Sequence, residues 1–284
     1  MSDILVLGAT GKTGRRVVER LAAAGATVRA AARIPGSVQP NIIPVRFDWD
    51  DVSTHDAALV GADAVYVIPP AFVVDHVAPS TALFERARAN GVRRAVLLSA
   101  RGVDASDDIP YRRTELALLA SGLDASIIRP SWFAQNFTEG VFAEGVANGV
   151  LAAPAADGLE PFIDADDIAD VAATLLLDTT SAHAGQAYNL SGAALYTFTG
   201  AAEVLSNAFG RPITYLDLTP EDFLAGAVAA GVPADYAALL GSLFEVIRNG
   251  WDAHLSDGVQ TVLGRPARTL EDWATTEAAA HATS

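Results

Sequence analysis

The sequence contains no cysteine, and this absence excludes several kinds of chemistry at once. Disulfide bonds, thiolate metal sites and cysteine nucleophiles are unavailable to the 284-residue chain. Histidine is also scarce, and the five histidines are scattered without any pair four residues apart: His55, His76, His183, His254 and His281. We therefore expect no metal site.

Basic residues are few compared with acidic ones. The chain has 19 lysines and arginines against 34 aspartates and glutamates, which gives a formal net charge of -15. An acidic surface repels phosphate backbones and anionic lipid headgroups. Nucleic acid and membrane partners are therefore not expected, and the simplest interpretation of the charge is that it keeps the protein in solution.

Long hydrophobic runs are missing as well. No stretch reaches the roughly 18 apolar residues of a membrane span. The first ten residues, MSDILVLGAT, lack the basic segment of a secretory signal. These absences predict a cytoplasmic protein, whose 51% hydrophobic residues are enough for one large core.

What the sequence does contain is an alternation of short apolar runs and helical patterns. Continuous apolar, β-branched runs separated by helices are typical of a parallel sheet that is covered on both faces. The predicted strands are residues 3–8, 27–33, 42–48, 62–70, 94–100 and 124–130, and the predicted helices are 12–25, 76–91 and 111–122. This is the doubly wound α/β pattern of a Rossmann fold.

After about residue 130 helical segments dominate. Thr219 and Thr269 are predicted to cap two of these helices, since each precedes acidic residues in a first turn. Two strands, near 161–164 and 187–192, are predicted to extend the sheet. We divide the chain into a nucleotide-binding core (1–130) and a C-terminal region (131–284) with late strands and a smaller, mainly helical substrate lobe, without a clean linear boundary.

The segment GATGKTG (8–14) lies between the first predicted strand and helix. Gly8 permits a tight turn, Gly11 lets a pyrophosphate approach the backbone, and Gly14 allows close helix–strand packing. A tight turn without a ligand is the alternative. The predicted cofactor-binding residues in this segment are Gly8, Thr10, Gly11, Lys12, Thr13 and Gly14.

The end of the second predicted strand distinguishes between cofactors. NAD sites usually place an acidic residue there for the ribose 2′-hydroxyl, whereas this chain has Arg33 in AAARIPGS. A guanidinium can bind the 2′-phosphate of NADP, and Lys12 adds positive charge nearby. We therefore predict NADP(H) rather than NAD(H). A solvated charge at a strand end is the alternative for Arg33.

Two further segments complete the predicted cofactor site. Asp48, with Trp49 beside it, is placed to meet the adenine amino group, although an aspartate that only forms a turn is an equal alternative. Ile68 and Pro69 end the fourth predicted strand and should pass near the nicotinamide ribose.

These segments, together with LLSARGVD (97–104), IIRPSWFAQNF (127–137) and FIDADDIADVAATLLLD (162–178), resemble the NmrA-like, atypical short-chain dehydrogenase/reductase family. The resemblance covers nearly the whole chain and points to the NAD(P)H-binding branch with quinone reductases and ergot-alkaloid enzymes. It implies a Rossmann fold, NADPH binding, and a substrate cleft between the sheet edge and the C-terminal lobe. It leaves activity open, because some relatives reduce quinones, imines or enones and others only sense the cofactor.

The segment IPYRRTE (109–115) stands where an ordinary short-chain reductase would carry Tyr-x-x-x-Lys. This chain has Tyr111 and Glu115 instead. Many members of the resembling branch have His-x-x-Thr-Glu at this place, so Glu115 follows the pattern of the branch and Tyr111 differs from it. A glutamate four residues along one helix face would raise the tyrosine pKa. The predicted catalytic residues are Tyr111, Ser99 and Glu115, with Ser99 also near the cofactor. The alternative is that all three are structural.

The segment SWFAQNF (131–137) offers flat apolar side chains with polar groups between them, which suits a planar or aromatic substrate. Core packing is the alternative, and it is expected for at least two of the aromatic residues. The predicted substrate-binding residues are Tyr111, Ser131, Trp132, Phe133, Asn136 and Phe137.

Together these patterns predict an NADPH-dependent oxidoreductase that transfers hydride to a planar electrophile, namely a quinone, an iminium ion or an activated alkene or carbonyl. Such acceptors need no proton in the hydride step, so the missing lysine matters little. An NADP(H)-sensing regulator without turnover, and a non-redox isomerase or lyase, remain open. A monomer and a homodimer are both compatible with the sequence.

Overall fold

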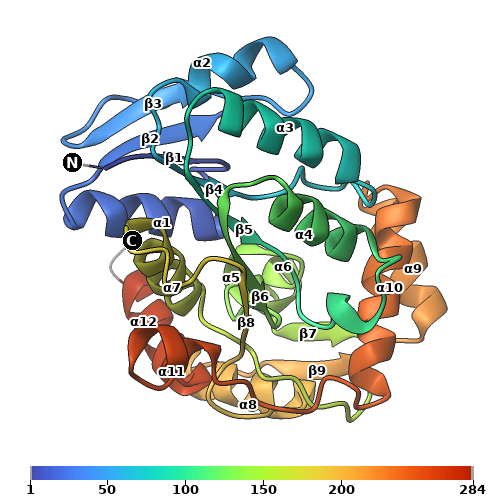
Figure 1. Ribbon diagram of the computed structural model, residues 1–284. Helices are drawn as coiled ribbons and strands as arrows, with labels where there is room; N and C mark the ends of the chain where they lie inside the picture. Colours follow the sequence, from blue (N-terminus) through green and yellow to red (C-terminus); the bar gives the residue numbers. More distant parts are fainter. Residues whose placement is uncertain (1, 283–284) are drawn as a thin grey trace.

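Seven parallel strands form the central sheet of the computed structural model, which describes residues 2–282 (Figure 1). The strands are β1 (Asp3–Val6), β2 (Thr27–Ala32), β3 (Ile42–Arg46), β4 (Ala64–Val67), β5 (Arg94–Leu98), β6 (Asp124–Pro130) and β8 (Gln186–Leu190). Their order in the sheet is β3-β2-β1-β4-β5-β6-β8. The order reverses between β1 and β4, and the predicted doubly wound α/β fold is confirmed.

Helices cover both faces of this sheet (Figure 1). One face carries α1 (Lys12–Ala23), α7 (Ala165–Leu177) and α11 (Gly258–Leu263), and the other carries α2 (His55–Leu59), α3 (Val77–Ala89) and α4 (Pro110–Ala120). Successive strand residues point to opposite faces, so Ile4 and Val6 join the first core and Leu5 joins the second. This double burial explains why the strands are continuous apolar runs.

The C-terminal region has a hydrophobic core of its own. It contains α5 (Asn136–Glu139), α6 (Ala143–Ala147), β7 (Val150–Ala153), α8 (Phe198–Phe209), β9 (Thr214–Asp217), α9 (Pro220–Ala229), α10 (Ala234–Arg248) and α12 (Leu270–Ala282). Short 3₁₀ turns lie at η1 (Val52–Thr54) and η2 (Val103–Ala105). The hydroxyls of Thr219 and Thr269 accept hydrogen bonds from the third residue after each, so both predicted caps are confirmed.

The late strands were predicted only in part. The segment 187–192 corresponds to β8, which joins the main sheet beside β6. The segment 161–164 is not a strand and makes a single bridge, between Phe133 and Ile163. The parallel pair β7–β9 was not predicted, because each strand has only four residues and the half-exposed β9 lacks a continuous apolar run.

The two regions are joined through the core that contains α1, because α7 belongs to the C-terminal half but packs on α1. Ion pairs reinforce this contact: Arg20 of α1 pairs with Asp166 and with Asp170 of α7, the latter at 3.0 Å. Arg268, just before α12, pairs with Asp170 at 3.1 Å. The division at residue 130 therefore separates the first six strands from the rest, but the core that contains α1 and α7 extends across it.

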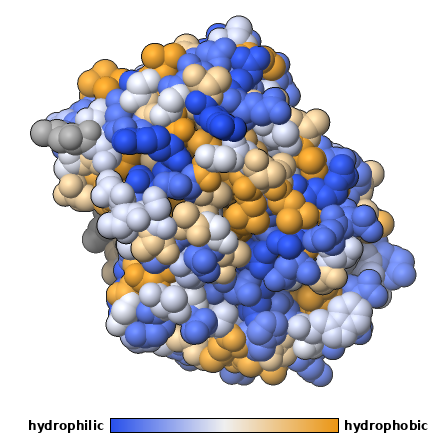
Figure 2. Space-filling model, in the orientation of Figure 1, coloured by the Kyte–Doolittle hydropathy of each residue, from blue (hydrophilic) through white to orange (hydrophobic). Residues whose placement is uncertain are grey.

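Hydrophilic residues dominate the face shown in Figure 2, and hydrophobic residues gather over α4. Leu116 and Leu119 of α4 are both more than one-third exposed. The expectation of a monomer or a homodimer stays a prediction. In the part of the chain that the structure describes, every helix is too short or too polar to cross a bilayer.

A close approach between backbone atoms at Gly14 predicts the effect of adding one methyl group there. A Cβ atom at Gly14 would lie 2.1 Å from the Gly8 carbonyl oxygen, whereas a Cβ at Gly226 of α9 would meet nothing within 4 Å. We expect Gly14→Ala to lower the melting temperature by several degrees, since backbone must move. Gly226→Ala, the matched control, should stabilise its helix by about 1 kcal/mol. Equal effects in thermal unfolding would contradict this packing.

Candidate functional site

The glycine-rich turn joins β1 to α1 at the point where the strand order reverses. Gly8 adopts a φ of 60°, and its carbonyl oxygen accepts a hydrogen bond of 2.8 Å from Gly11 N–H. Gly11 is the N-cap of α1, and no side chain caps the helix. The first-turn N–H groups therefore remain available to a ligand, and together with the helix dipole they suit a pyrophosphate.

The polar side chains of this turn point in different directions. Thr10 is exposed, whereas Thr13 is buried beneath the helix, so only its backbone can face a ligand. Lys12 Nζ donates a hydrogen bond of 2.9 Å to Asn136 Oδ1 of α5, and burial lowers the pKa of this amine. Lys12 therefore joins the glycine-rich turn to the C-terminal region, and its contribution of positive charge near Arg33 stays a prediction.

Arg33 directly follows β2, and its side chain is exposed. Within the described residues it makes no hydrogen bond and no ion pair with the protein. A cavity of about 220 Å³ lies between α1, β2 and β3, and its lining includes Ala32, the residue before Arg33, together with Thr10 and Gln39. An unpaired guanidinium at this edge fits the phosphorylated ribose of NADP(H).

Asp48 lies in a turn that is held by its backbone. Its N–H donates to Thr54 Oγ1 at 3.0 Å, and its carbonyl accepts from His55 Nε2 at 2.9 Å. Its carboxylate accepts only from Asp50 N–H, at 3.2 Å. The turn-forming role is thus present, and a second role at the adenine stays a prediction. Trp49 packs edge-on against Phe47, with ring centroids 5.3 Å apart.

The end of β4 lies across the crevice from the glycine-rich turn. Ile68 Cδ1 would be 3.2 Å from a Cβ at Gly8, so its side chain rests against the turn. Pro69 is buried and Pro70 is half-buried. The segments after β1 and β4 therefore form the two sides of the crevice in which doubly wound folds bind nucleotides.

Glu115 forms the centre of a buried ion pair. It is 0% exposed, and Arg129 at the end of β6 donates to both carboxylate oxygens, from Nε at 2.8 Å and from Nη2 at 2.6 Å. Ser99 Oγ donates to the same carboxylate at 2.6 Å. Both side chains therefore join β5, β6 and α4, and the catalytic roles expected for Glu115 and Ser99 stay predictions.

Tyr111 lies at the start of α4 in a cluster of aromatic rings from three segments. Its ring packs edge-on against His76 at 4.4 Å, and Tyr236 of α10 packs on Phe72 at 5.2 Å. Burial raises the pKa of Tyr111 to about 12, with Tyr236 as the second cause. The expected rise is present, but Glu115 is not its source. We call Phe72, His76, Tyr111 and Tyr236 the aromatic cluster.

Three members of the aromatic cluster were missed by the sequence reading. His76 is 0% exposed, its Nδ1 is hydrogen-bonded to Thr114 Oγ1 at 3.0 Å, and burial lowers its pKa. Phe72 is 57% exposed in the loop after β4, and Tyr236 lies 164 positions farther along the chain than Phe72. Only the tertiary fold brings these rings together, so no local motif marks them.

The segment 131–137 is mainly structural. Ser131 Oγ donates to the Pro161 carbonyl at 2.6 Å, and Phe137 is 0% exposed in the C-terminal core. Trp132 packs on Phe244, with ring centroids 4.7 Å apart. Half-buried Phe133 packs on the core between the sheet and helices α1 and α7. Ser131, Phe137 and Asn136 thus have structural contacts, since Asn136 accepts a hydrogen bond from Lys12. The substrate-binding role expected for this segment stays a prediction.

A second buried polar group lies beyond the carboxyl end of β5. Arg101 Nε lies 2.8 Å from Asp252 Oδ1, and Arg101 also donates to the His254 carbonyl. Glu160 is 0% exposed, accepts from Trp132 N–H at 3.1 Å, and has one oxygen without a partner. Burial, and secondly the charge of Asp252, raise the pKa of Glu160 to about 8. Nothing in the loop sequence indicated this burial.

Comparisons with known proteins agree with this geometry. The family described as NAD(P)H-binding matches residues 8–179. The NAD(P)H azoreductase of Xenophilus azovorans is 32% identical, over 98% of this chain and 98% of its own length. The uncharacterized oxidoreductase YesF of Bacillus subtilis is 30% identical, over 98% of this chain and 96% of its own.

Solved structures agree as well. The NADPH complex of the quinone oxidoreductase QOR2 from Escherichia coli superposes with a TM-score of 0.81 at 25% identity, covering 96% of this chain and 99% of that one. The negative transcriptional regulator Nmra, at 16% identity and a TM-score of 0.73 over 99% of this chain and 98% of that one, shares the fold. The chain belongs to the NmrA-like, atypical short-chain dehydrogenases/reductases, an NAD(P)H-binding family. It is an NAD(P)H-dependent oxidoreductase of that type.

The buried Glu115–Arg129 pair predicts a structural phenotype. Glu115→Gln leaves the Arg129 charge buried and poorly compensated, so we expect a loss of about 3 kcal/mol in the free energy of unfolding, measured by urea denaturation. Glu203→Gln, on the exposed face of α8, is the matched control and should change stability by less than about 0.5 kcal/mol. Unchanged stability with abolished turnover would instead make Glu115 catalytic.

The raised pKa of Glu160 predicts a pH dependence of stability. The folded protein keeps this proton up to about pH 8, whereas the unfolded chain releases it near the ordinary value of 4.5. Folding therefore binds a proton between these values, and stability must fall as the pH rises from 5 to 8. Glu160→Gln should flatten that part of the curve, by on the order of 1 kcal/mol for each pKa unit. Parallel curves for the two proteins would contradict the assignment.

Proposed function

We propose that this protein is an NADPH-dependent oxidoreductase that transfers hydride to a planar electrophile without a Tyr-x-x-x-Lys relay. The observation that carries the proposal is Arg33, an exposed guanidinium without a protein partner at the end of β2. In a chain of net charge -15, such a cation beside the nucleotide crevice supports preference for the 2′-phosphorylated cofactor.

The surroundings of Tyr111 support the choice of acceptor. With a pKa of about 12, the phenol stays protonated at neutral pH. The carboxylate of Glu115 is neutralised by Arg129, and the neighbouring His76 is neutral at that pH because burial lowers its pKa. No group here lowers the pKa of the phenol, so Tyr111 can donate a hydrogen bond to an acceptor but is a poor proton donor to a developing alkoxide.

Acceptors that form a stabilised product avoid this difficulty. A quinone that gains hydride becomes a hydroquinone anion, which takes its proton from water, and an iminium ion becomes a neutral amine without any proton. A simple ketone becomes a basic alkoxide, which needs an acid at once. The names of relatives agree, since they include an azoreductase and a quinone oxidoreductase.

The residues of this chain would then have the following roles. Bound NADPH would supply the hydride, and the chain would position it. The first turn of α1 would hold the pyrophosphate, Arg33 the 2′-phosphate, and Ile68 and Pro69 the nicotinamide ribose. The aromatic cluster would hold the flat acceptor, with Tyr111 directing its hydroxyl toward the reducible group.

Turnover of a substrate panel tests the proposal. NADPH oxidation is followed by absorbance with quinones, cyclic iminium ions, enones and simple ketones. We expect turnover with the first two classes and at least about tenfold less with ketones. Tyr111→Phe should reduce quinone turnover by less than about tenfold, since only a neutral hydrogen bond is lost. Saturable NADPH binding with no turnover on any member would favour a cofactor sensor or a non-redox enzyme.

The cofactor preference is tested separately. Arg33→Ala should raise the KM for NADPH by about 10- to 100-fold, because a charge-assisted contact to the 2′-phosphate is lost, and should leave the KM for NADH nearly unchanged. Arg93→Ala is the control. Arg93 precedes β5, at the amino-terminal ends of the strands and thus away from Arg33, and it pairs with Asp63. An equal effect on both cofactors would refute the role of Arg33.

A further inference from the structure

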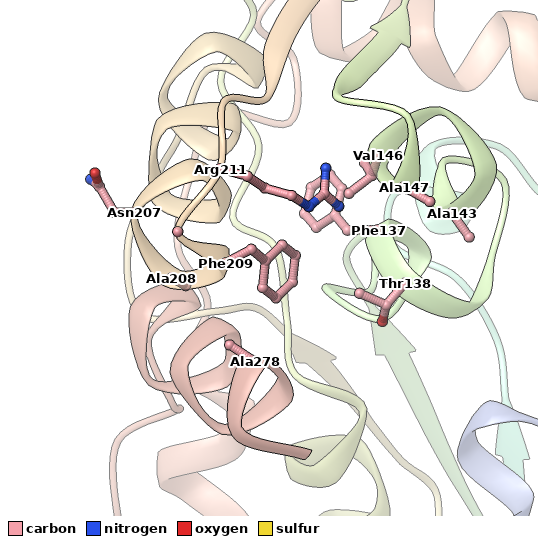
Figure 3. A pocket seen from close by; sticks show the side chains of 11 residues that line it. Phe137, Thr138, Ala143, Val146, Ala147, Asn207, Ala208, Phe209, Arg211 and Ala278 are labelled. Atoms are coloured by element: carbon pink, nitrogen blue, oxygen red, sulfur yellow. The ribbon is translucent and has the colours of Figure 1, made fainter. Parts of the chain in front are cut away.

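A cavity lined by helices of the C-terminal region lies away from the nucleotide crevice. It has a volume of about 560 Å³, which falls in the range of small-molecule sites. Its walls come from α5, α6, the end of α8 and α12, as Figure 3 shows. The lining residues are Phe137, Thr138, Ala143, Val146, Ala147, Asn207, Ala208, Phe209, Gly210, Arg211 and Ala278.

The side chains that line the cavity are apolar except for Thr138, Asn207 and Arg211, and only Arg211 carries a charge. Arg211 and Phe209 extend from the end of α8 across the cavity toward Phe137 and Val146, whereas Asn207 points away (Figure 3). Gly210 makes this possible, since its left-handed φ of 63° ends α8 and redirects the chain. The Arg211 guanidinium lies 5.9 Å from the centroid of the Phe209 ring.

Arg211 lacks an acidic partner, which is unusual in this protein. Of the 19 basic residues, all of which the structure describes, only Arg33 and Arg211 have neither a hydrogen bond nor an ion pair. With 34 acidic residues available, an unpaired guanidinium inside a cavity indicates an anionic ligand. Thr138 Oγ1 of α5, also in the cavity wall, is buried without a hydrogen-bond partner.

The walls of the cavity are held in place by contacts on their far sides. The first residue of α5, Asn136, binds Lys12, and its last residue, Glu139, pairs with Arg15 at 2.7 Å. Trp273 of α12 is buried in the core that also includes α8. The cavity is therefore formed before a ligand arrives, which reduces the entropic cost of binding.

We propose that this cavity binds a small carboxylate with an apolar body. One guanidinium matches one carboxylate through two parallel hydrogen bonds. The alanine, valine and phenylalanine side chains accept a flat or branched hydrocarbon. A phosphate dianion would need more donors than this wall offers.

Calorimetric titration of the full chain at low ionic strength tests the proposal. The probes are 2-naphthoate and decanoate, with 2-naphthylmethanol as the uncharged analogue and inorganic phosphate as the anion without an apolar body. We expect saturable 1:1 binding of at least one carboxylate. The uncharged analogue and phosphate should bind about tenfold more weakly or not at all.

Two variants locate the binding. Arg211→Gln should weaken carboxylate binding by about tenfold or more through loss of the charge. Ala278→Phe, on the half-buried side of α12, should abolish binding by filling the cavity while the charge remains. Arg248→Gln on α10, whose guanidinium lies 3.8 Å from the Asp217 carboxylate, is the matched control and should bind normally.

Melting temperatures and NADPH turnover of the variants show that each is folded. The proposal is overturned if neither carboxylate binds saturably, if phosphate binds as well as the carboxylates, or if binding survives both Arg211→Gln and Ala278→Phe. If carboxylate binding survives in both variants and the carboxylate also inhibits turnover competitively, the probe binds in the nicotinamide crevice instead.

Discussion

The buried pair between Glu115 and Arg129 holds together the carboxyl edge of the sheet. Arg129 lies near the end of β6, Glu115 lies on α4, and Ser99 joins them from the end of β5. Removing two charges from water is costly, and close bidentate geometry offsets that cost only when every lone pair is satisfied. The orientation of α4, and hence the position of Tyr111 at its start, depends on this contact.

This contact also explains the unusual segment IPYRRTE. In a short-chain reductase with Tyr-x-x-x-Lys, the fifth residue acts on the tyrosine from within the same helix. Here the fifth residue turns toward Arg129, and the pKa of Tyr111 is raised by burial. The helix keeps its place in the fold, while a glutamate stands where the lysine of that motif would be. Under the proposed function, hydride transfer then depends on holding the cofactor and the acceptor face to face.

Unpaired charge is the most informative electrostatic feature of the molecule. Nearly every arginine is bound to an acid or a carbonyl, including those that join α1 to α7 and α7 to the start of α12. Arg33 and Arg211 are the exceptions. Arg211 lines one cavity, and Ala32, the residue before Arg33, lines another. Because the chain has 34 acidic residues, an arginine without an ion pair is not explained by a shortage of carboxylates. The backbone places Arg33 and Arg211 where no carboxylate of the described chain reaches them.

The sequence by itself determined the doubly wound sheet, the glycine-rich turn and the family. These features depend on local patterns: apolar runs of strand length, glycines where only hydrogen atoms fit, and threonine caps before acidic turns. Tertiary structure alone decided that Glu115 forms an ion pair with Arg129 and that Phe137 lies in the core. It also decided that the rings of the aromatic cluster lie together. The physical reason is that pairing and burial are properties of neighbours in space, and these neighbours lie far apart along the chain.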